Sequence, residues 1–280
     1  MPELLPTRDG SYTLQSDLFG ATYHSLHGAC TESRHVFTEA GLRHHYESCS
    51  DNIEGAYTIQ LLEIGAGSLL NAAVALDFAR EYGGELSPSD AGLDSQSQSH
   101  TLPHSLSRPR IRNESQSLSP PHTCPRSLQL HYTGVELYPL EWDVIRKLHA
   151  ACAVELRPES WAEVIRLYPE LMKGASQAVG PHSLQLWIGD ALQWNGLHKP
   201  ANVVFFDAFA PESQPQMWEE AFLQKVVGWM QPGACLVTYC VKGEVRRRFQ
   251  SLGCTTEKLP GPPGKREILR VQKPKNPSCT

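Results

Sequence analysis

Three acidic residues stand where apolar segments of the chain end, and this spacing is suited to ligand binding. Glu136, Asp190 and Asp207 each lie at or just after the end of a run that reads as a buried strand. The carboxyl ends of neighbouring parallel strands meet along one edge of an open α/β sheet. We therefore expect the three carboxylates to lie together at that edge, where they can accept hydrogen bonds from hydroxyl and amino groups of a ligand.

A glycine turn precedes these acids in the chain. The run Leu62-Glu63-Ile64-Gly65-Ala66-Gly67 ends an apolar segment and is followed by a helical pattern at 69–82. Glycines allow a sharp turn and a close ligand approach, and the helix start offers free N–H groups. With the acids, the turn suits an adenosine: Glu136 would bind the ribose, and Asp190 with Ala191 would lie at the base.

Other interpretations of these residues stay open at this point. A strand-glycine-helix turn is often only a turn, and Glu136 is also compatible with an ordinary loop acid. A dehydrogenase would fit the first turn about as well. A P-loop hydrolase is disfavoured because no Gly-Lys-Ser or Gly-Lys-Thr follows the first strand.

The elements that must position these residues alternate between strand and helix. This alternation predicts an α/β fold with a doubly wound, Rossmann-like, mostly parallel sheet and a terminal antiparallel hairpin. The expected strands lie at 57–64, 128–137, 183–188, 203–206, 234–241, 254–259 and 267–271. The expected helices lie at 69–82, 140–154, 160–173, 216–230 and 243–252.

The predicted domain organisation is a cap at 1–56, a main domain at 57–271 and a tail at 272–280. Within the cap we expect a short strand at 12–14 and a helix from about Thr31 to Ala40 that Gly41 ends. The cap is either a solvated cover of the sheet or a lid that brings polar groups to the site. Residues 85–127 are rich in Ser, Pro, Gln and His and predict a poorly ordered, low-complexity insertion.

Composition narrows the class of protein. The 280 residues are 40% hydrophobic and carry a formal charge of −5, so a nucleic-acid partner must use a local basic patch. The eight cysteines form no Cys-x-x-Cys pair, which favours buried thiols over a zinc site. The N-terminus lacks a signal-like apolar core, and no run of eighteen apolar residues occurs. We therefore predict a cytoplasmic protein with no membrane contact and no metal.

Two motifs make a resemblance specific. Leu62-Glu63-Ile64-Gly65-Ala66-Gly67 resembles the first motif of class I S-adenosylmethionine-dependent methyltransferases, with Asn71 retained after it and Leu69 where a third glycine is common. Asp207-Ala208-Phe209-Ala210-Pro211 with Pro215-Gln216-Met217-Trp218 is similar to a narrower group, the methyltransferase half of the tRNA wobble-uridine enzyme MnmC and its single-domain relatives. Further matching segments are Asp9-Gly10-Ser11, Tyr23-His24-Ser25, Gly28-Ala29, Glu32, Gly233, Val245-Arg246-Arg247 and Gly264-Lys265-Arg266-Glu267.

The resemblance implies a reaction and a site. Methyl transfer from S-adenosyl-L-methionine to the amine of 5-aminomethyl-uridine, with or without a 2-thio group, would take place at the wobble position. Asp207 would hold the amine and help to take its proton. The implied cofactor-binding residues are Glu63, Gly65, Gly67, Asn71, Glu136, Asp190 and Ala191. No flavin is implied, since this sequence shows no flavin-dependent oxidase half and would resemble the single-activity members.

The substrate side is also implied by the resemblance. Tyr23, His24, Ser25 and Glu32 would form a cap over cofactor and substrate, although His24 also fits a satisfied polar histidine. Phe209 would pack against the uracil ring, or else simply belong to the core.

The implied partner is the tRNA anticodon loop, presented with a flipped wobble base. Arg246, Lys265 and Arg266, with neighbouring arginines, would supply positive charge for its phosphates. A solvated helix face explains the arginines equally well. The alternatives are a methyltransferase of the same fold that acts on a small-molecule amine, and a non-catalytic RNA-binding or assembly protein. The oligomeric state is left open.

Overall fold

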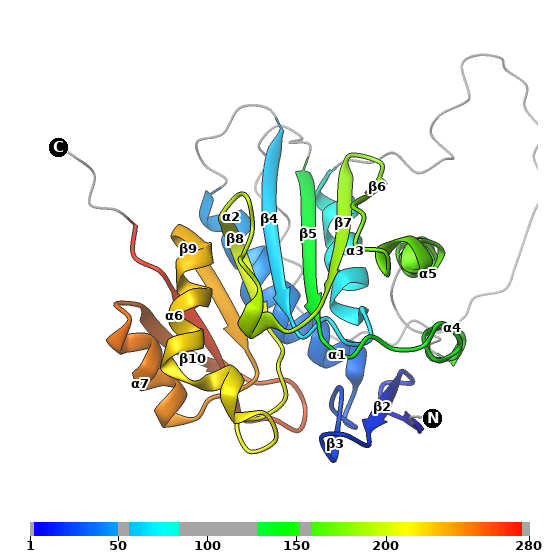
Figure 1. Ribbon diagram of the computed structural model, residues 1–280, viewed down its shortest axis with the longest axis horizontal. Coiled ribbons are helices and arrows are strands. Elements are labelled where there is room, and N and C mark those ends of the chain that lie inside the picture. The colour runs from blue at the N-terminus through cyan, green and yellow to red at the C-terminus, as the bar shows by residue number, and fades with distance from the viewer. Residues whose placement is uncertain (1–2, 50–55, 84–127, 152–157, 276–280) are drawn as a thin grey trace, which may run out of the picture.

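An eight-stranded sheet organises the computed structural model, which describes residues 3–49, 56–83, 128–151 and 158–275 (Figure 1). The strand order is β10-β11-β9-β8-β4-β5-β7-β6. The strands are β4 (Tyr57–Ile64), β5 (Leu128–Glu136), β6 (Gln177–Val179), β7 (His182–Ile188), β8 (Ala201–Phe206), β9 (Met230–Thr238), β10 (Thr255–Pro260) and β11 (Glu267–Gln272). The five strands from β9 to β7 pair in parallel, and β6, β10 and β11 pair antiparallel. The predicted doubly wound sheet with its closing hairpin is confirmed.

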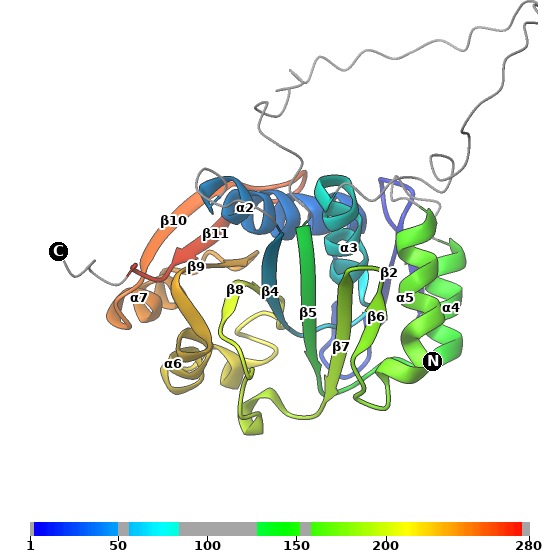
Figure 2. The same cartoon turned by 90° about the horizontal axis from the view of Figure 1, so that it is seen from above.

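Helices cover both faces of this sheet (Figure 2). One face carries α1 (Ala29–Ser33), the π-helical segment η1 (Arg34–Arg43), α2 (His44–Cys49), α3 (Leu70–Gly83), α4 (Trp142–Ala151) and α5 (Pro158–Leu171). The other carries the 3₁₀ turn η4 (Pro215–Trp218), α6 (Glu220–Trp229) and α7 (Gly243–Ser251). Successive residues of β8 therefore enter different cores. Phe205 packs on Phe37 of η1, with ring centroids 5.1 Å apart, and Phe206 packs on Trp218, at 4.9 Å.

The strand order reverses at β4. The chain runs from β4 outward through β5 to β7 and then returns to β8 on the other side of β4. Ligands of open α/β sheets bind beyond the carboxyl ends of strands at such a reversal. A small antiparallel sheet of β1 (Leu4–Pro6), β2 (Tyr12–Ser16) and β3 (Ala21–Thr22) lies beyond these carboxyl ends in Figure 1. The N-terminal residues thus approach the place where a ligand is expected.

Several predicted boundaries differ from the structure. The N-terminal helix does not end at Gly41 but continues to Cys49. A Cβ at Gly41 would lie 2.7 Å from Cγ2 of Val237, so this glycine allows close packing on the sheet rather than ending the helix. Strand β9 begins at Met230, before the expected stop at 231–233, and ends at Thr238. The edge strand β6 was not predicted because three residues carry too short a pattern.

Parts of the prediction lie outside the described residues. These parts are the insertion at 85–127, the end of the helix expected at 140–154, and the last five residues of the tail. Among the described residues, no helix is long and apolar enough to cross a membrane. The same residues contain no group of three or more His, Cys, Asp or Glu side chains arranged to hold a metal ion.

Candidate active site

The glycine turn after β4 brings three segments into contact. The N–H of Gly65 donates to the carbonyl of Val135 at 3.0 Å, and its φ is +85°. A Cβ at Gly65 would lie 2.7 Å from the carbonyl oxygen of Asp207, and one at Gly67 (φ +47°) would lie 3.0 Å from the ring of Tyr23. Both positions therefore require glycine for the turn to approach β8 and the N-terminal sheet.

Leu69 adopts the backbone conformation that glycine usually supplies. Its φ is +60°, and among the described residues it is the one non-glycine residue with a positive φ. Its side chain is only 1% exposed and packs in the core. The position where the resembled family commonly has a third glycine thus keeps a left-handed shape with a leucine in it, at a cost of about 1–2 kcal/mol.

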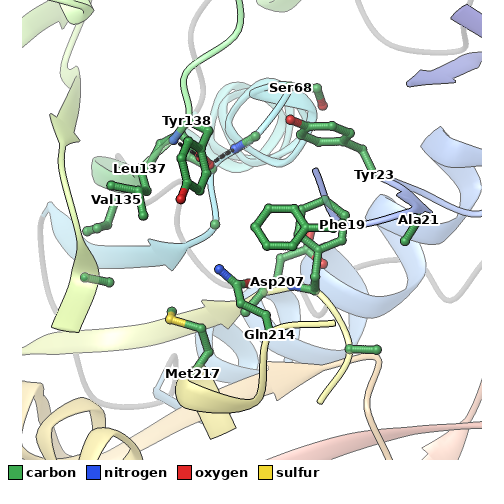
Figure 3. A pocket seen from close by; sticks show the side chains of 18 of the residues that line it. Phe19, Ala21, Tyr23, Ser68, Val135, Leu137, Tyr138, Asp207, Gln214 and Met217 are labelled. Atoms are coloured by element: carbon green, nitrogen blue, oxygen red, sulfur yellow. Dashed lines mark hydrogen bonds between the residues drawn. The ribbon is translucent and has the colours of Figure 1, made fainter. Parts of the chain in front are cut away.

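A cavity of about 460 Å³ opens beside this turn, at the carboxyl ends of the strands (Figure 3). It is lined by twelve of the residues that the sequence singled out: Tyr23, His24, Ser25, Glu32, Gly65, Gly67, Glu136, Asp190, Ala191, Asp207, Phe209 and Lys265. The lining residues that sequence analysis missed include Phe19, Ser68, Tyr138, Gln214 and Tyr239. The three strand-end acids therefore share one cavity wall, as their spacing predicts.

Two of these acids are held by backbone N–H groups. The Glu136 carboxylate accepts from the N–H of Gly67 at 2.7 Å and of Tyr138 at 2.8 Å. Burial raises its pKa, and these hydrogen bonds oppose that rise. The Asp190 carboxylate accepts from the N–H of Leu192 at 2.9 Å and caps the short turn η3 (Ala191–Gln193). Both carboxylates are thereby fixed in the cavity wall.

Asp207 follows β8 and lines the cavity beside the glycine turn. Its Oδ2 accepts from the amide of Asn71 at 2.9 Å, and the same amide nitrogen donates to Glu63 at 2.6 Å. Burial and then the neighbouring Glu32 carboxylate raise the pKa of Asp207 to about 7, against the opposing effects of Asn71 and Lys265. A carboxyl group with this pKa can take or release a proton near neutral pH.

Glu63 and Asn71 lie behind the cavity wall rather than in it. Glu63 is 0% exposed, and it also accepts a hydrogen bond from the hydroxyl of Tyr132. The hydroxyl of Ser33 donates to the side-chain oxygen of Asn71, which orients the amide toward the two carboxylates. Burial and the Asp207 charge raise the pKa of Glu63 well above its ordinary value. These two residues therefore support Asp207 and the turn; their positions do not support direct contact with a ligand in the cavity.

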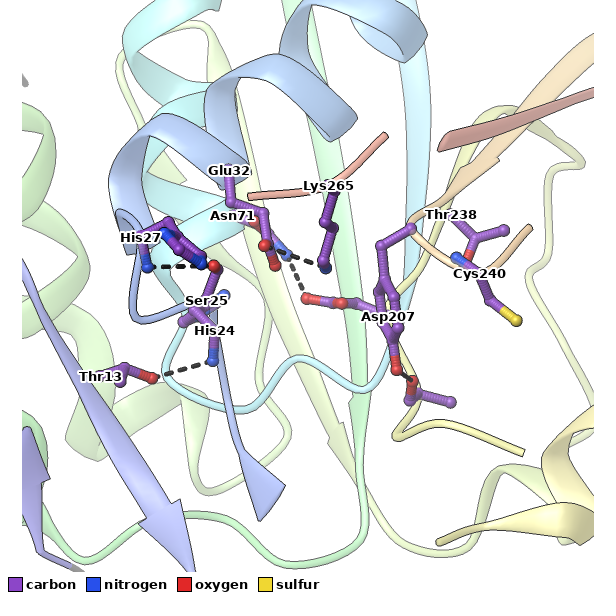
Figure 4. Close-up of polar contacts among 12 residues, drawn as sticks. Thr13, His24, Ser25, His27, Glu32, Asn71, Asp207, Thr238, Cys240 and Lys265 are labelled. Atoms are coloured by element: carbon purple, nitrogen blue, oxygen red, sulfur yellow. Dashed lines mark hydrogen bonds and ion pairs between the residues drawn. The ribbon is translucent and has the colours of Figure 1, made fainter. Parts of the chain in front are cut away.

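An ion pair joins the two ends of the chain across the cavity (Figure 4). Nζ of Lys265, in the loop between β10 and β11, lies 3.0 Å from Oε2 of Glu32 on α1. It also lies 4.2 Å from the ring centroid of Tyr239, in a cation–π contact. The loop is fixed further by His35, whose Nε2 lies 2.8 Å from the carbonyl of Pro260. Of the described lining residues, Lys265 is the one Lys or Arg among four acids.

His24 is buried and carries no charge near neutral pH. Its Nε2 lies 2.9 Å from the hydroxyl of Ser68, and its N–H donates to Oγ1 of Thr13 at 2.9 Å. Burial and the Lys265 charge lower its pKa to about 4. The neighbouring hydroxyl of Ser25 accepts from the N–H of His27 at 3.1 Å.

The basic residues of the predicted RNA surface differ in their positions. Arg246 and Arg266 do not line the cavity; Arg266 is exposed on the hairpin loop, and Arg246 is partly buried on α7. Arg247 is exposed, whereas Arg248 donates to the carbonyl of Trp218 at 2.7 Å and supports η4. The exposed pair thus remains available for a partner, and Arg248 is structural.

Comparisons with known proteins find a matching family model and several named relatives. The model of a family described as S-adenosyl-L-methionine-dependent methyltransferase matches residues 157–274. The bifunctional protein MnmC of Marinobacter nauticus, named for tRNA 5-methylaminomethyl-2-thiouridine biosynthesis, is 36% identical over 156 residues, which are 52% of this chain and 23% of that protein. The protein of the same name from a Psychrobacter species is 26% identical over 94% of this chain and 36% of its own length.

A solved structure extends the likeness to the fold. The crystal structure of MnmC2 from Aquifex aeolicus matches with a TM-score of 0.65 and 21% identity, covering 99% of this chain and 72% of that one. The chain spans about a quarter of the first curated relative and about a third of the second. The chain is thus similar in sequence to parts of the MnmC proteins, and it shares the fold of MnmC2 from Aquifex aeolicus.

Proposed function

We propose that this protein transfers a methyl group from S-adenosyl-L-methionine to the amine of 5-aminomethyl-uridine, or its 2-thio form, at the tRNA wobble position. The observation that carries the proposal is the single cavity that joins the glycine turn and the strand-end acids to Asp207, in a chain related to MnmC. The names of the relatives support the wobble uridine and tRNA as the substrate.

The residues of the cavity fit S-adenosylmethionine. Gly65 and Gly67 make a close turn at the head of α3, and Glu136 fixes a carboxylate beside it that can accept from ribose hydroxyls. Asp190 and Ala191 line the same wall and would hold the base. When bound, the cofactor supplies an electrophilic methyl group on its sulfonium.

Asp207 would act on the acceptor amine. Its carboxylate would orient the amine and accept a proton from it, so that the nitrogen lone pair is free to form the new N–C bond while the S–C bond breaks and S-adenosylhomocysteine leaves. Four acids and one cation among the described lining residues also favour a substrate that arrives as a positively charged aminomethyl group.

An RNA partner would contact the exposed arginines. Arg247 and Arg266 lie at the surface on α7 and on the hairpin loop, and phosphate contacts there would make binding weaker at high salt. The anticodon loop is the expected element because it presents the wobble base unpaired. We also propose a cytoplasmic location, since tRNA is the proposed substrate.

The test is methyl transfer from labelled S-adenosylmethionine to bulk tRNA from cells that lack wobble-uridine methylation, followed by nucleoside analysis. We expect label in 5-methylaminomethyl-uridine or its 2-thio form. Asp207→Ala should abolish transfer and keep cofactor binding by calorimetry. The matched control Asp143→Ala removes an exposed acid, whose side chain is 68% exposed, and should behave like wild type.

Other outcomes would redirect the assignment. Cofactor binding without label in tRNA, but with label in free amines, would favour a small-molecule methyltransferase. Absence of both cofactor binding and transfer would favour a non-catalytic RNA-binding or assembly protein. Full activity of Asp207→Ala would remove Asp207 from the mechanism.

A further inference from the structure

Four aromatic rings from three segments meet at the cavity, and we call them the ring cluster: Phe19, Tyr23, Tyr138 and Phe209. Phe19 and Phe209 are stacked, with centroids 4.3 Å apart and planes inclined by 28°. Tyr23 meets Phe209 edge to face at 5.4 Å, and Tyr138 meets Phe19 edge to face at 5.9 Å. In Figure 3 the labelled side chains of Tyr138, Phe19 and Tyr23 face the same space.

The two stacked rings are carried by different parts of the chain. The carbonyl of Phe209 accepts from Nε1 of Trp218 at 2.8 Å, and its N–H donates to Oε1 of Gln214 at 3.1 Å. Phe19 stands on the tight turn between β2 and β3, where its N–H donates to Oγ of Ser16 at 3.3 Å, and its neighbour Leu18 is 61% exposed. The backbone of Phe209 is therefore anchored to Gln214 and Trp218, and Phe19 lies at the edge of the small sheet.

Phe209 places the two stacked rings close to Asp207 in the cavity. It lies two residues after Asp207, and both side chains line the same cavity. Tyr138, which lies on the other side of Phe19, is 48% exposed, so the ring cluster reaches from the acid to solvent. A flat ring that enters from solvent and carries an amine would meet aromatic faces first and the Asp207 carboxylate beyond them.

We propose that Phe19 and Phe209 form a stacking slot for one flipped pyrimidine base of an RNA loop, in which Phe19 determines specificity for a planar acceptor. The inference rests on the proposed function and names how its substrate is held. Aromatic side chains stack on bases without sequence preference, and each such contact contributes strongly to affinity. In this structure the two rings stack directly on each other. They would separate when the base binds, and the base would insert between them.

The test compares three variants of Phe19 with a neighbour. Phe19→Leu keeps an apolar side chain without a flat ring, Phe19→Ala removes the ring, and Phe19→Trp keeps a flat aromatic ring. Leu18→Ala changes the adjacent exposed residue, which does not line the cavity. The readouts are the Kd for an anticodon stem-loop RNA bearing 5-aminomethyl-uridine, the kcat and KM with full tRNA, and the Kd for S-adenosylmethionine.

We expect Phe19→Ala and Phe19→Leu to weaken stem-loop binding and raise KM by roughly ten-fold or more, which is the size of one lost base–aromatic stack. Phe19→Trp should restore both values, and Leu18→Ala should match wild type. The affinity for S-adenosylmethionine should stay within about two-fold in every variant, and melting temperatures serve as a check that each variant is folded.

Each contrary result has a distinct meaning. Methyl transfer to tRNA with Phe19→Leu equal to wild type would overturn the slot and leave the proposed function standing. An equal loss of cofactor affinity in Phe19→Leu would overturn it as well, since the ring would then cover the cofactor. Stem-loop binding that depends on Phe19, without any methyl transfer, would sustain the slot and overturn the proposed function. A wild-type protein that binds no stem-loop would overturn the slot, and one that also transfers no methyl group to tRNA would overturn both proposals.

Discussion

Asp207 carries a cost in stability that follows from its place in the site. A buried carboxyl whose pKa is raised binds a proton more tightly in the folded chain than in the unfolded one. The folded state is then favoured at low pH and loses that advantage as pH rises from about 3.8 toward 7. Function and stability therefore oppose each other at this residue.

Asp207→Asn should stabilise the fold while it abolishes methyl transfer. The neutral amide avoids the buried charge, so the gain should be largest at pH 8, up to about 4 kcal/mol, and should vanish near pH 4, where Asp207 is already protonated. Urea unfolding at the two pH values measures it. Asp190→Asn makes the same carboxyl-to-amide change in the cavity wall and keeps a good capping side chain at η3, so it is the control and should leave the stability close to that of wild type. A gain that is equal at both pH values would contradict a raised pKa at Asp207.

The left-handed backbone of Leu69 leads to a second prediction about a single residue, which concerns the stability of two variants. Both Leu69→Ala and Leu69→Gly lose the burial of a side chain that is 1% exposed, but only glycine also relieves the φ of +60°. Leu69→Gly should therefore be more stable than Leu69→Ala by about 1 kcal/mol, the reverse of the usual order. Denaturant unfolding of the two variants decides it, and a less stable glycine variant would show that the turn can relax around alanine.

At the scale of elements, the N-terminal helix is shaped by what it packs against. The sequence around Gly41 predicts a helix end, yet the helix continues through η1 and α2 over the sheet. Local propensity was overridden because the missing Cβ lets the helix lie directly on Val237 and Phe205. This contact is long-range in sequence, so no local pattern could have indicated it.

Gly41→Ala should consequently destabilise the protein. The new methyl group would lie 2.7 Å from Val237, and overpacking of this kind costs about 1–3 kcal/mol, more than the gain in helix propensity. Gly228→Ala in α6 is the matched control because a Cβ there meets no atom within 4 Å; it should be neutral or stabilising by up to about 1 kcal/mol. Thermal unfolding of both variants gives the comparison, and equal effects would point to propensity alone.

At the scale of the whole molecule, the site is completed from both ends of the chain. Glu32 comes from the N-terminal helix and Lys265 from the C-terminal hairpin, and their ion pair stands beside Asp207. The two charges act on the Asp207 carboxyl in opposite directions, and Glu136 adds to the effect of Glu32. The proton affinity of the site therefore depends on how the ends are folded together.

Removing the negative charge of Glu32 and removing the positive charge of Lys265 should shift the pH profile of methyl transfer in opposite directions. Glu32→Gln removes a negative neighbour and should shift the acidic limb of methyl transfer to lower pH, since Asp207 then ionises more easily. Lys265→Met removes a positive neighbour and should shift that limb to higher pH. Single-turnover rates from pH 5 to 9 measure the two shifts. Because titration of the substrate amine is common to both variants, shifts in the same direction would show that the pair does not act on Asp207.

The sequence alone determined the sheet, its main helices, the glycine turn and the strand-end acids, because these depend on local periodicity and on where each apolar run stops. Only the tertiary structure decided which residues share the cavity. It moved Glu63 and Asn71 behind the wall, separated Arg246 and Arg266 from the cavity, and brought Phe19 onto Phe209. Contacts of this kind join positions far apart in the chain, and their formation depends on packing that no single segment encodes.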